Sequence, residues 1–142
     1  MSARDQHRQE IAAVVEQYRR GFTTMDVEVL QAIWDQGYDN LIYIAQEMAL
    51  PVCGWAGIER YYRRVASFVE RVRSMTVSDV SVELFGDVAY AFCLFHFEGE
   101  AKGQHHIADG RVTFILHRTS GTWKVIHYHE SAPGPFGRTE DA

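Results

Sequence analysis

Two histidines lie one residue apart near the end of the chain, in the stretch WKVIHYHES, which covers residues 123–131. In a β-strand, residues i and i+2 point to the same face of the sheet, about 7 Å apart. The imidazoles of His127 and His129 can therefore act together. They could bind a metal, transfer a proton, orient a ligand or form hydrogen bonds within a core.

A metal site at these two histidines lacks a third ligand. Glu130 points to the opposite face of the strand, and His105 and His106 lie near a predicted loop. We therefore predict no metal. Proton transfer needs no further ligand, because the ordinary imidazole pKa of about 6.5 makes both protonation states available near neutral pH. The alternative is that each ring is partly buried and bonded to a neighbour such as Ser131 or a backbone carbonyl.

Other side chains could contribute to a pocket. His96 follows Tyr90, Phe92 and Leu94 at every second position, so it lies either in a cavity or at the solvent rim of a strand. Aromatic side chains of the segments before and within the third helix could line the mouth of a pocket, or could be ordinary core: Tyr43, Trp55 and Tyr62. No Ser-His-Asp or Cys-His arrangement, phosphate-binding loop or dinucleotide fingerprint is visible, and the two cysteines have no metal-binding spacing.

Apolar residues recur at helical spacing in three segments. The first segment begins near Asp5, and its stripe is Ile11, Val14, Val15, Tyr18 and Phe22. Asp26 can cap a second, shorter helix that ends near Gly37. The third segment has the clearest pattern, from Ile58 to Val72. These patterns predict three helices in the first half of the chain.

The remaining pattern is that of strands. Residues 41–45 form a short apolar run, and after residue 74 the apolar period becomes two, which predicts strands at 76–85, 88–99, 105–118 and 122–131. Helices followed by a meander of strands indicate an α+β fold with a mostly antiparallel sheet. Strand 88–99 is apolar on both faces, so both need a cover. The helices cover one face; for the other we expect a second copy, giving a homodimer through the sheet.

Composition limits the partners. The 142 residues carry a formal charge of −5 and are 46% hydrophobic, which suits one folded domain, here residues 1–132 with a loosely held tail at 133–142. A net acidic chain is a poor nucleic-acid binder, because binding to phosphates needs a basic face. The polar N-terminus and the absence of a long apolar run predict neither export nor membrane insertion, so the expected location is the cytoplasm.

The order of elements, with IAAVVEQY in the first helix and GRVTFILHRTSGTWKVIHYHES at the end, resembles the nuclear transport factor two-like superfamily and its SnoaL-like branch. The last segment is similar to the end of the calcium/calmodulin-dependent kinase II association domain. The shared positions are Thr113, His117, Arg118, Gly121, Trp123, His127, His129 and Ser131. The resemblance implies a cone, in which a strongly curved sheet wraps three N-terminal helices around a pocket.

The resemblance also implies roles for single residues. Tyr18 matches the first-helix tyrosine that donates a hydrogen bond to the substrate oxyanion in ketosteroid isomerases. The aspartate base of those enzymes is absent, because the matching stretch is LIYIAQ. His96 and Phe114 stand where the association domain places two pocket arginines, so the carboxylate-binding pair of that domain is half lost and His96 alone remains polar. Tyr18 and His96 therefore remain as polar candidates.

The expected function is binding of a small organic molecule in an apolar and aromatic pocket. If the protein is an enzyme, a cofactor-free isomerisation, cyclisation or dehydration fits, with His129, His96 and Tyr18 as catalytic residues. The predicted ligand-binding residues are Tyr43, Trp55, Tyr62, Phe92, Phe114 and His127. The alternative is a non-catalytic ligand-binding or oligomerisation module, because superfamilies of this kind hold enzymes and assembly domains alike.

Overall fold

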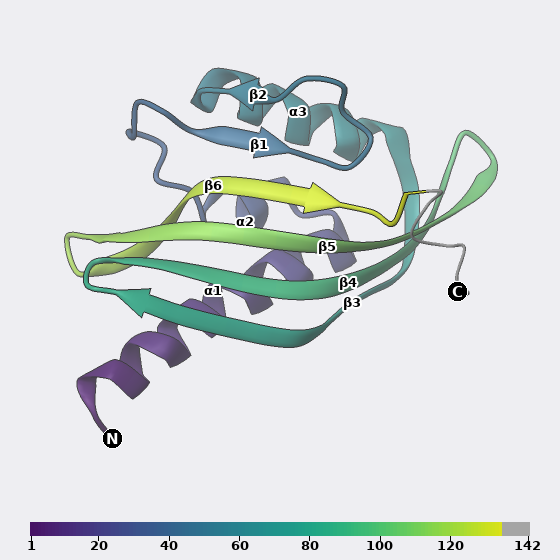
Figure 1. The fold of residues 1–142 in the computed structure, drawn as a ribbon. Helices are drawn as coiled ribbons and strands as arrows, with labels where there is room; N and C mark the ends of the chain where they lie inside the picture. The colour runs from purple at the N-terminus through teal and green to yellow at the C-terminus, as the bar shows by residue number, and fades with distance from the viewer. Residues whose placement is uncertain (135–142) are drawn as a thin grey trace.

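Three helices lie against one face of a curved sheet (Figure 1). The computed structural model describes residues 1–134, and all helices and strands named here belong to that part of the chain. The helices are α1 (Ala3–Thr24), α2 (Val27–Gln31) and α3 (Trp55–Phe68). The strands are β1 (Ile42–Ile44), β2 (Val52–Cys53), β3 (Val69–Phe85), β4 (Val88–Ala101), β5 (Gln104–Thr119) and β6 (Thr122–Ser131).

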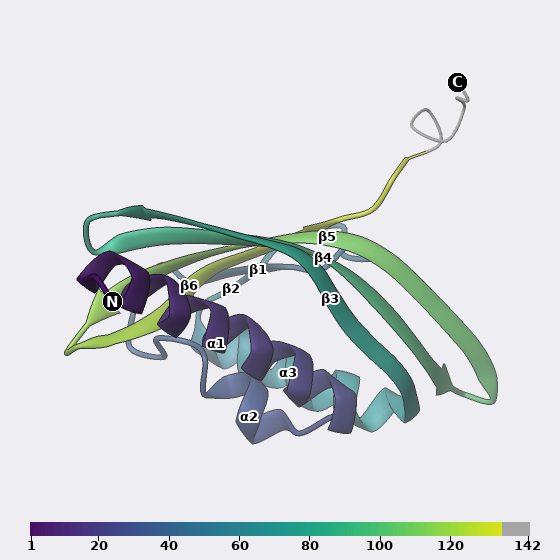
Figure 2. The ribbon, with the colours of Figure 1, turned by 90° about the horizontal axis from the view of Figure 1, so that it is seen from below.

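The sheet has the strand order β2-β1-β6-β5-β4-β3. Neighbouring strands are antiparallel except for β1 and β6, which run parallel. Seen from below, the long strands β3, β4 and β5 bend toward the ends of α1 and α3, so the sheet forms a concave cover over the helices (Figure 2). The predicted α+β fold, with a curved and mostly antiparallel sheet around three helices, is confirmed.

Two predicted helix ends were wrong. Asp26 does cap α2, but this helix ends at Gln31 and not near Gly37. Helix α3 ends at Phe68, although the apolar pattern continued to Val72. The reason is tertiary: the long β4–β5 hairpin offers backbone partners to the chain that follows α3, and Val72 pairs with Gly99 in β3 and β4. Valine is a good strand former, so this pairing overrides the helical pattern.

Strand β6 carries one extra residue. Leu116 of β5 pairs with Val125, but the preceding Ile115 pairs with His127, so Ile126 has no partner of its own and forms a β-bulge. Strict alternation is broken at this point. Before the bulge, Val125 is buried under the helices; after it, the buried residue is Tyr128. The bulge therefore reverses which face the odd and even residues of β6 occupy.

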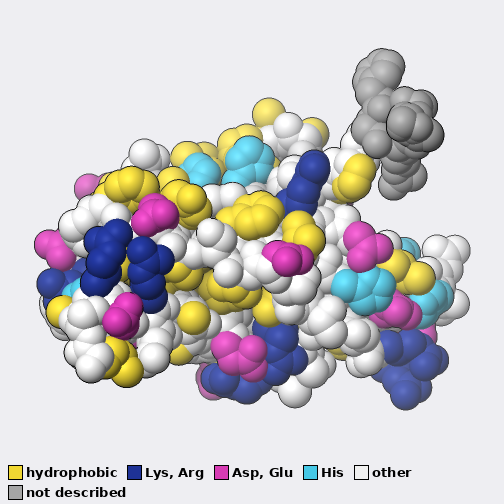
Figure 3. Space-filling view, turned by 60° about the horizontal axis from the view of Figure 1, so that its bottom comes forward, with side chains coloured by type: hydrophobic (Ala, Val, Ile, Leu, Met, Phe, Trp, Pro, Cys, Tyr) yellow, Lys and Arg dark blue, Asp and Glu magenta, His cyan; other side chains and the backbone are white. Residues whose placement is uncertain are grey.

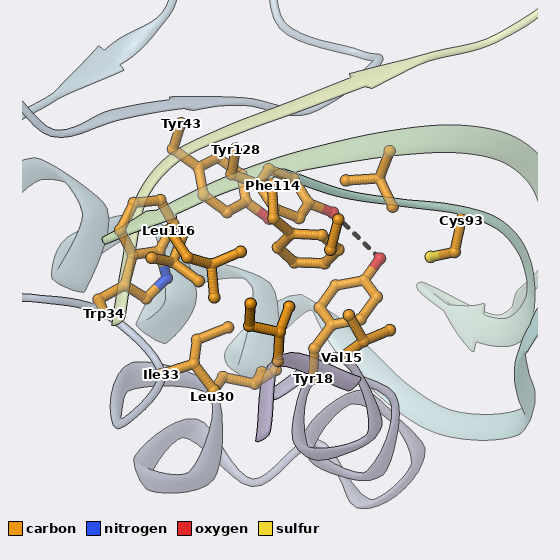
Figure 4. Packing of buried hydrophobic residues seen from close by; sticks show 14 of the residues in the cluster. Val15, Tyr18, Leu30, Ile33, Trp34, Tyr43, Cys93, Phe114, Leu116 and Tyr128 are labelled. Carbon is orange, nitrogen blue, oxygen red and sulfur yellow. Dashed lines mark hydrogen bonds between the residues drawn. The ribbon is translucent and has the colours of Figure 1, made fainter. Parts of the chain in front are cut away.

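The core between the sheet and the helices is rich in buried aromatic side chains (Figure 4). Tyr43 and Tyr128 stack, with ring centroids 4.4 Å apart and an angle of 12° between the rings. Trp34 donates a hydrogen bond from Nε1 to the hydroxyl of Tyr62, at 2.9 Å. Such pairs satisfy the polar ends of large apolar rings inside the core.

Two expectations about the ends of the chain and the membrane can be compared with the structure. Of the predicted tail, residues 135–142 lie outside the described residues. Within residues 1–134, no helix combines the length and the apolar character needed to cross a membrane.

The close approach of β3 to β4 at Gly99 gives a stability prediction. A Cβ at this position would lie 2.7 Å from the carbonyl oxygen of Arg71, which is backbone and cannot move aside. We expect Gly99→Ala to lower the free energy of unfolding by about 1–3 kcal/mol. Chemical denaturation measures this free energy of unfolding. The control is Gly37→Ala, where the nearest atom is 3.8 Å away and the expected change is within about 0.5 kcal/mol. Equal effects of the two substitutions would contradict the packing at Gly99.

Candidate functional site

A cavity of about 400 Å³ lies at the end of the molecule where the C-terminal ends of α1 and α3 meet the bent part of the sheet. Its deep part is formed by buried side chains: Tyr18, Tyr43, Met75 and Phe95. Phe68 and His106 are exposed and stand at its mouth. The volume lies within the range of about 300–1,000 Å³ that is usual for small-molecule pockets, and much of the lining is aromatic.

Glu130 brings a carboxyl group into this cavity from the end of β6. Its Oε1 accepts a hydrogen bond from the backbone N–H of Gln46, at 3.0 Å, and its Oε2 accepts one from the hydroxyl of Tyr128. Burial raises the pKa of Glu130 from an ordinary 4.5 to about 7, against the opposing effect of these two hydrogen bonds. The charge of Glu47 adds to the rise. Glu130 can therefore take up and release a proton near neutral pH.

Three polar groups form a chain that starts at this carboxyl. The hydroxyls of Tyr18 and Tyr128 lie 3.1 Å apart, shown by the dashed line in Figure 4. Because the only hydroxyl hydrogen of Tyr128 is donated to Glu130, the hydroxyl of Tyr18 must donate to Tyr128. Burial raises the pKa of Tyr18 well above its ordinary value, and so does the negative charge of Glu130. Both tyrosines therefore stay protonated, and each hydroxyl can donate one hydrogen bond and accept another within the chain.

A second carboxylate stands nearer the mouth. The hydroxyl of Tyr61, on α3, donates to Oε2 of Glu47 at 2.6 Å. Burial and this hydrogen bond raise the pKa of Tyr61. Glu47 is exposed and Glu130 is not, so the two carboxylates of the cavity differ in environment. No lysine or arginine lines the cavity among the residues that the structure describes.

Two of the predicted site residues, Tyr18 and Tyr43, line the cavity. Tyr62 and Phe114 are buried in the core behind it, where Phe114 packs edge-on against Tyr18 with ring centroids 5.1 Å apart. Trp55 begins α3 and is only partly buried. None of these three side chains belongs to the lining, and Tyr62 and Phe114 pack against lining tyrosines from behind.

The paired histidines of the opening stretch lie on the outer face of the sheet. His129 is exposed and His127 is half-buried, with ring centroids 6.2 Å apart. Burial lowers the pKa of His127, and so does the neighbouring His129. Strict alternation puts both rings on the face of Trp123 and Val125, but the bulge at Ile126 turns them outward. Tyr128 and Glu130 take the inward positions instead.

His96 and Phe92 are also on the outer face. Strand β4 buries Ala91, Cys93 and Phe95 under the helices, which turns the alternate residues outward. His96 bonds to Asp109 through Nδ1, at 2.6 Å, and to Glu98 through Nε2, at 2.9 Å. The hydrogen bonds to Glu98 and Asp109 raise the pKa of this half-buried imidazole. The catalytic histidines of the sequence analysis thus have no place in the cavity.

Glu130 and Gln46 are the functional candidates that the sequence analysis did not select. Glu130 was placed opposite the histidines, which is correct, but the histidines' face was taken as the inner one. A pocket-facing carboxylate at Glu130 could have been found only by locating the bulge at Ile126. Within residues 1–134, no group of three or more His, Cys, Asp or Glu side chains is arranged to hold a metal ion.

The raised pKa of Glu130 makes stability depend on pH. The carboxyl titrates near 4.5 when unfolded and near 7 when folded, so between these values the folded state holds the extra proton and stability falls as the pH rises. The full cost is about 3 kcal/mol, at about 1.4 kcal/mol per pKa unit. Glu130→Gln should therefore gain stability relative to wild type between about pH 5 and about pH 8, measured by denaturant unfolding.

The control for this measurement is Glu28→Gln, which removes an exposed carboxyl from α2. The gain of Glu130→Gln should exceed that of the control and should grow with pH. If the stability difference between Glu130→Gln and wild type were the same at about pH 5 and at about pH 8, this result would contradict the burial of the Glu130 carboxyl.

Comparison with known proteins agrees with this fold. A structure of a proposed dehydratase of the NTF2-like family from Streptomyces avermitilis superimposes with a TM-score of 0.81 and 18% identity, covering 92% of this chain and 99% of that one. An NTF2-like superfamily protein from Salmonella enterica serovar Typhimurium gives 0.81 and 19%, covering 97% and 99%. A proposed calcium/calmodulin-dependent protein kinase type II association domain from Thiobacillus denitrificans gives 0.73 and 17%, covering 87% and 94%. No curated protein sequence matches the chain.

At these identities, the solved structures establish the fold and not the activity. The sequence profile of the SnoaL-like domain matches residues 11–135, which is most of the chain. This match includes α1 from Ile11 onward, the cavity-lining strands and Glu130. The chain belongs to the family of SnoaL-like domains, and its fold is that of the NTF2-like structures.

Proposed function

We propose that this protein binds a small organic molecule in the cavity and moves a proton on it, as an isomerase, cyclase or dehydratase does. The observation that carries this proposal is the inward carboxyl of Glu130, whose pKa of about 7 suits a general base at neutral pH. A base of this kind removes a proton from a carbon next to a carbonyl group. The apolar walls exclude water from the reacting atoms.

The chain of hydroxyls can return the proton to the substrate. Each oxygen of Glu130 accepts one hydrogen bond from the protein, which leaves lone pairs for a substrate proton. After Glu130 has taken a proton from a substrate carbon, the hydroxyls of Tyr128 and Tyr18 turn so that the hydrogen bonds run from Glu130 to Tyr128 to Tyr18. Glu130 then gives its proton to Tyr128, Tyr128 gives its own to Tyr18, and Tyr18 gives its own to the substrate oxygen, so that Glu130 ends ionised and both tyrosines end protonated. One proton leaves carbon and one arrives at oxygen, so an enol forms and the enzyme keeps its charge.

Hydrogen exchange tests this proposal without knowledge of the natural substrate. Small hydroxyketones, which carry a hydroxyl donor beside the carbonyl group, lose their α-proton NMR signals in D₂O when a base removes those protons. We expect at least one compound to exchange faster with the protein, and Glu130→Gln to slow that exchange by about 100-fold or more. Tyr18→Phe should slow it less, because the base remains.

The same assay compares Glu130 with the histidine of the sequence analysis. His129 is exposed on the outer face, so His129→Ala should keep the exchange rate of wild type. Exchange that survives in Glu130→Gln and is lost in His129→Ala would refute Glu130 as the base. Ligand binding without any enhanced exchange would favour the second candidate function, a non-catalytic binding module.

We also propose a homodimer through the outer face of the sheet. Tyr90 and Leu94 are each 36% exposed there, and Phe92 and Ile115 border a shallow hollow beside them. The upper part of Figure 3, which looks obliquely onto this face, shows several groups of hydrophobic side chains with histidines beside them. A second copy is the simplest cover for such a face, since an isologous contact matches the same patch with itself. The cytoplasm remains the proposed location.

Sedimentation tests the dimer. We expect wild type to have twice the 16.3 kDa mass of the chain, and Phe92→Glu to have the mass of one chain, because it would bury a charge in the contact. Leu50→Glu is the matched control, since Leu50 is 78% exposed in the loop before β2. A monomeric wild type, or a dimer that survives Phe92→Glu, would contradict this interface.

A further inference from the structure

The polar groups of the cavity are mainly hydrogen-bond acceptors. Glu130 keeps free lone pairs on both carboxylate oxygens. Oε1 of Gln46 is buried and has no partner among the described residues. This oxygen lies beside Gly110, where an added Cβ would come within 2.9 Å of it. A buried acceptor without a partner is costly, and a ligand that donates a hydrogen bond would remove that cost.

Two tyrosine hydroxyls that line the cavity already donate to acceptors within the protein. The hydroxyl of Tyr18 donates to Tyr128, and that of Tyr61 donates to Glu47. While Glu130 is ionised, a ligand that only accepts hydrogen bonds therefore finds neither of these two hydroxyls free.

The charges that line the cavity also favour a ligand that donates hydrogen bonds. Glu47 and Glu130 both line the cavity, and no lysine or arginine among the described residues balances them there. His106 stands exposed at the mouth and not in the deep part. A carboxylate or phosphate group that entered would lose water and meet a second negative charge. An ammonium group would meet a carboxylate and the faces of aromatic rings.

We infer that the cavity takes a ligand whose polar end donates hydrogen bonds, an alcohol or an amine on a small apolar body, and that it rejects carboxylates and phosphates. This inference rests on the proposed function in one respect, since it concerns the same cavity. It names the substrate class of that site: the donor group contacts Gln46 and Glu130, and the apolar body lies among the aromatic side chains.

Four probes with one ring test the inference. Benzyl alcohol and methoxybenzene are isomers, but only the alcohol donates a hydrogen bond; benzylamine adds a positive charge and benzoate a negative one. NMR titration at about pH 8, where Glu130 is mostly ionised, gives each affinity and the amide signals that move. We expect the signal of Gln46 to move, and the alcohol and the amine to bind about tenfold or more tightly than methoxybenzene. Benzoate should cause no shift at the cavity.

The variant Glu130→Gln separates the two donors. It removes the charge and keeps an acceptor oxygen, so benzylamine should lose about tenfold or more in affinity and benzyl alcohol much less. Glu98→Gln, which removes a carboxylate of the outer face, is the matched control and should change neither affinity. Methoxybenzene or benzoate binding as tightly as the alcohol would overturn the inference, and so would failure of both donors to bind.

The results of these titrations test the ligand class, and the results of the hydrogen-exchange assay test the proton-transfer function, so either proposal can fail alone. If the donors bind as expected but no ketone exchanges its protons faster with the protein, the ligand class stands and the proton-transfer function fails. If exchange depends on Glu130 but methoxybenzene binds as well as benzyl alcohol, the function stands and the ligand class fails.

Discussion

One extra residue in strand β6 decides which chemistry the cavity contains. Ile126 forms the bulge, and Tyr128 and Glu130 after it therefore point under the helices while His127 and His129 point outward. The parallel partner β1 then ends beside Glu130, so the backbone of Gln46 can donate to the carboxyl group. Without the bulge, two histidines would occupy the inner face and the carboxyl would lie on the surface. The proposed base and its hydrogen-bond chain both depend on this irregularity.

Burial of the Glu130 carboxyl lowers the stability of the folded protein, and the same burial makes the carboxyl a suitable base. Burial raises the pKa of Glu130 because the ionised form loses water, and two hydrogen bonds offset only part of that loss. The aromatic core around it can carry this cost, since Tyr43, Tyr128 and Phe114 pack closely under the sheet. A carboxyl held at the border of ionisation is suited to both taking and giving a proton.

Periodicity was sufficient for most of the fold. The helical spacing of Ile11 to Phe22 and the alternation after residue 74 predicted the main helix and the four long strands. The end of α3 was missed because the pairing of Val72 with Gly99 depends on distant residues. The candidate site was harder to predict from the sequence than the fold. Tyr18 was found through the resemblance to ketosteroid isomerases, which could be transferred because Tyr18 lies on a regular helix. Glu130 was missed because a single bulge reverses alternation and leaves no local signal in the sequence.

The central claim is that Glu130 is a buried, inward carboxyl that titrates near neutral pH. The most direct measurement is a pH titration of its side-chain ¹³C carboxyl signal by NMR, assigned by its loss in Glu130→Gln. A midpoint near 7 is the expected result. A midpoint near 4.5, the ordinary value, would show that the group is solvated and would contradict its proposed role as the base of this cavity.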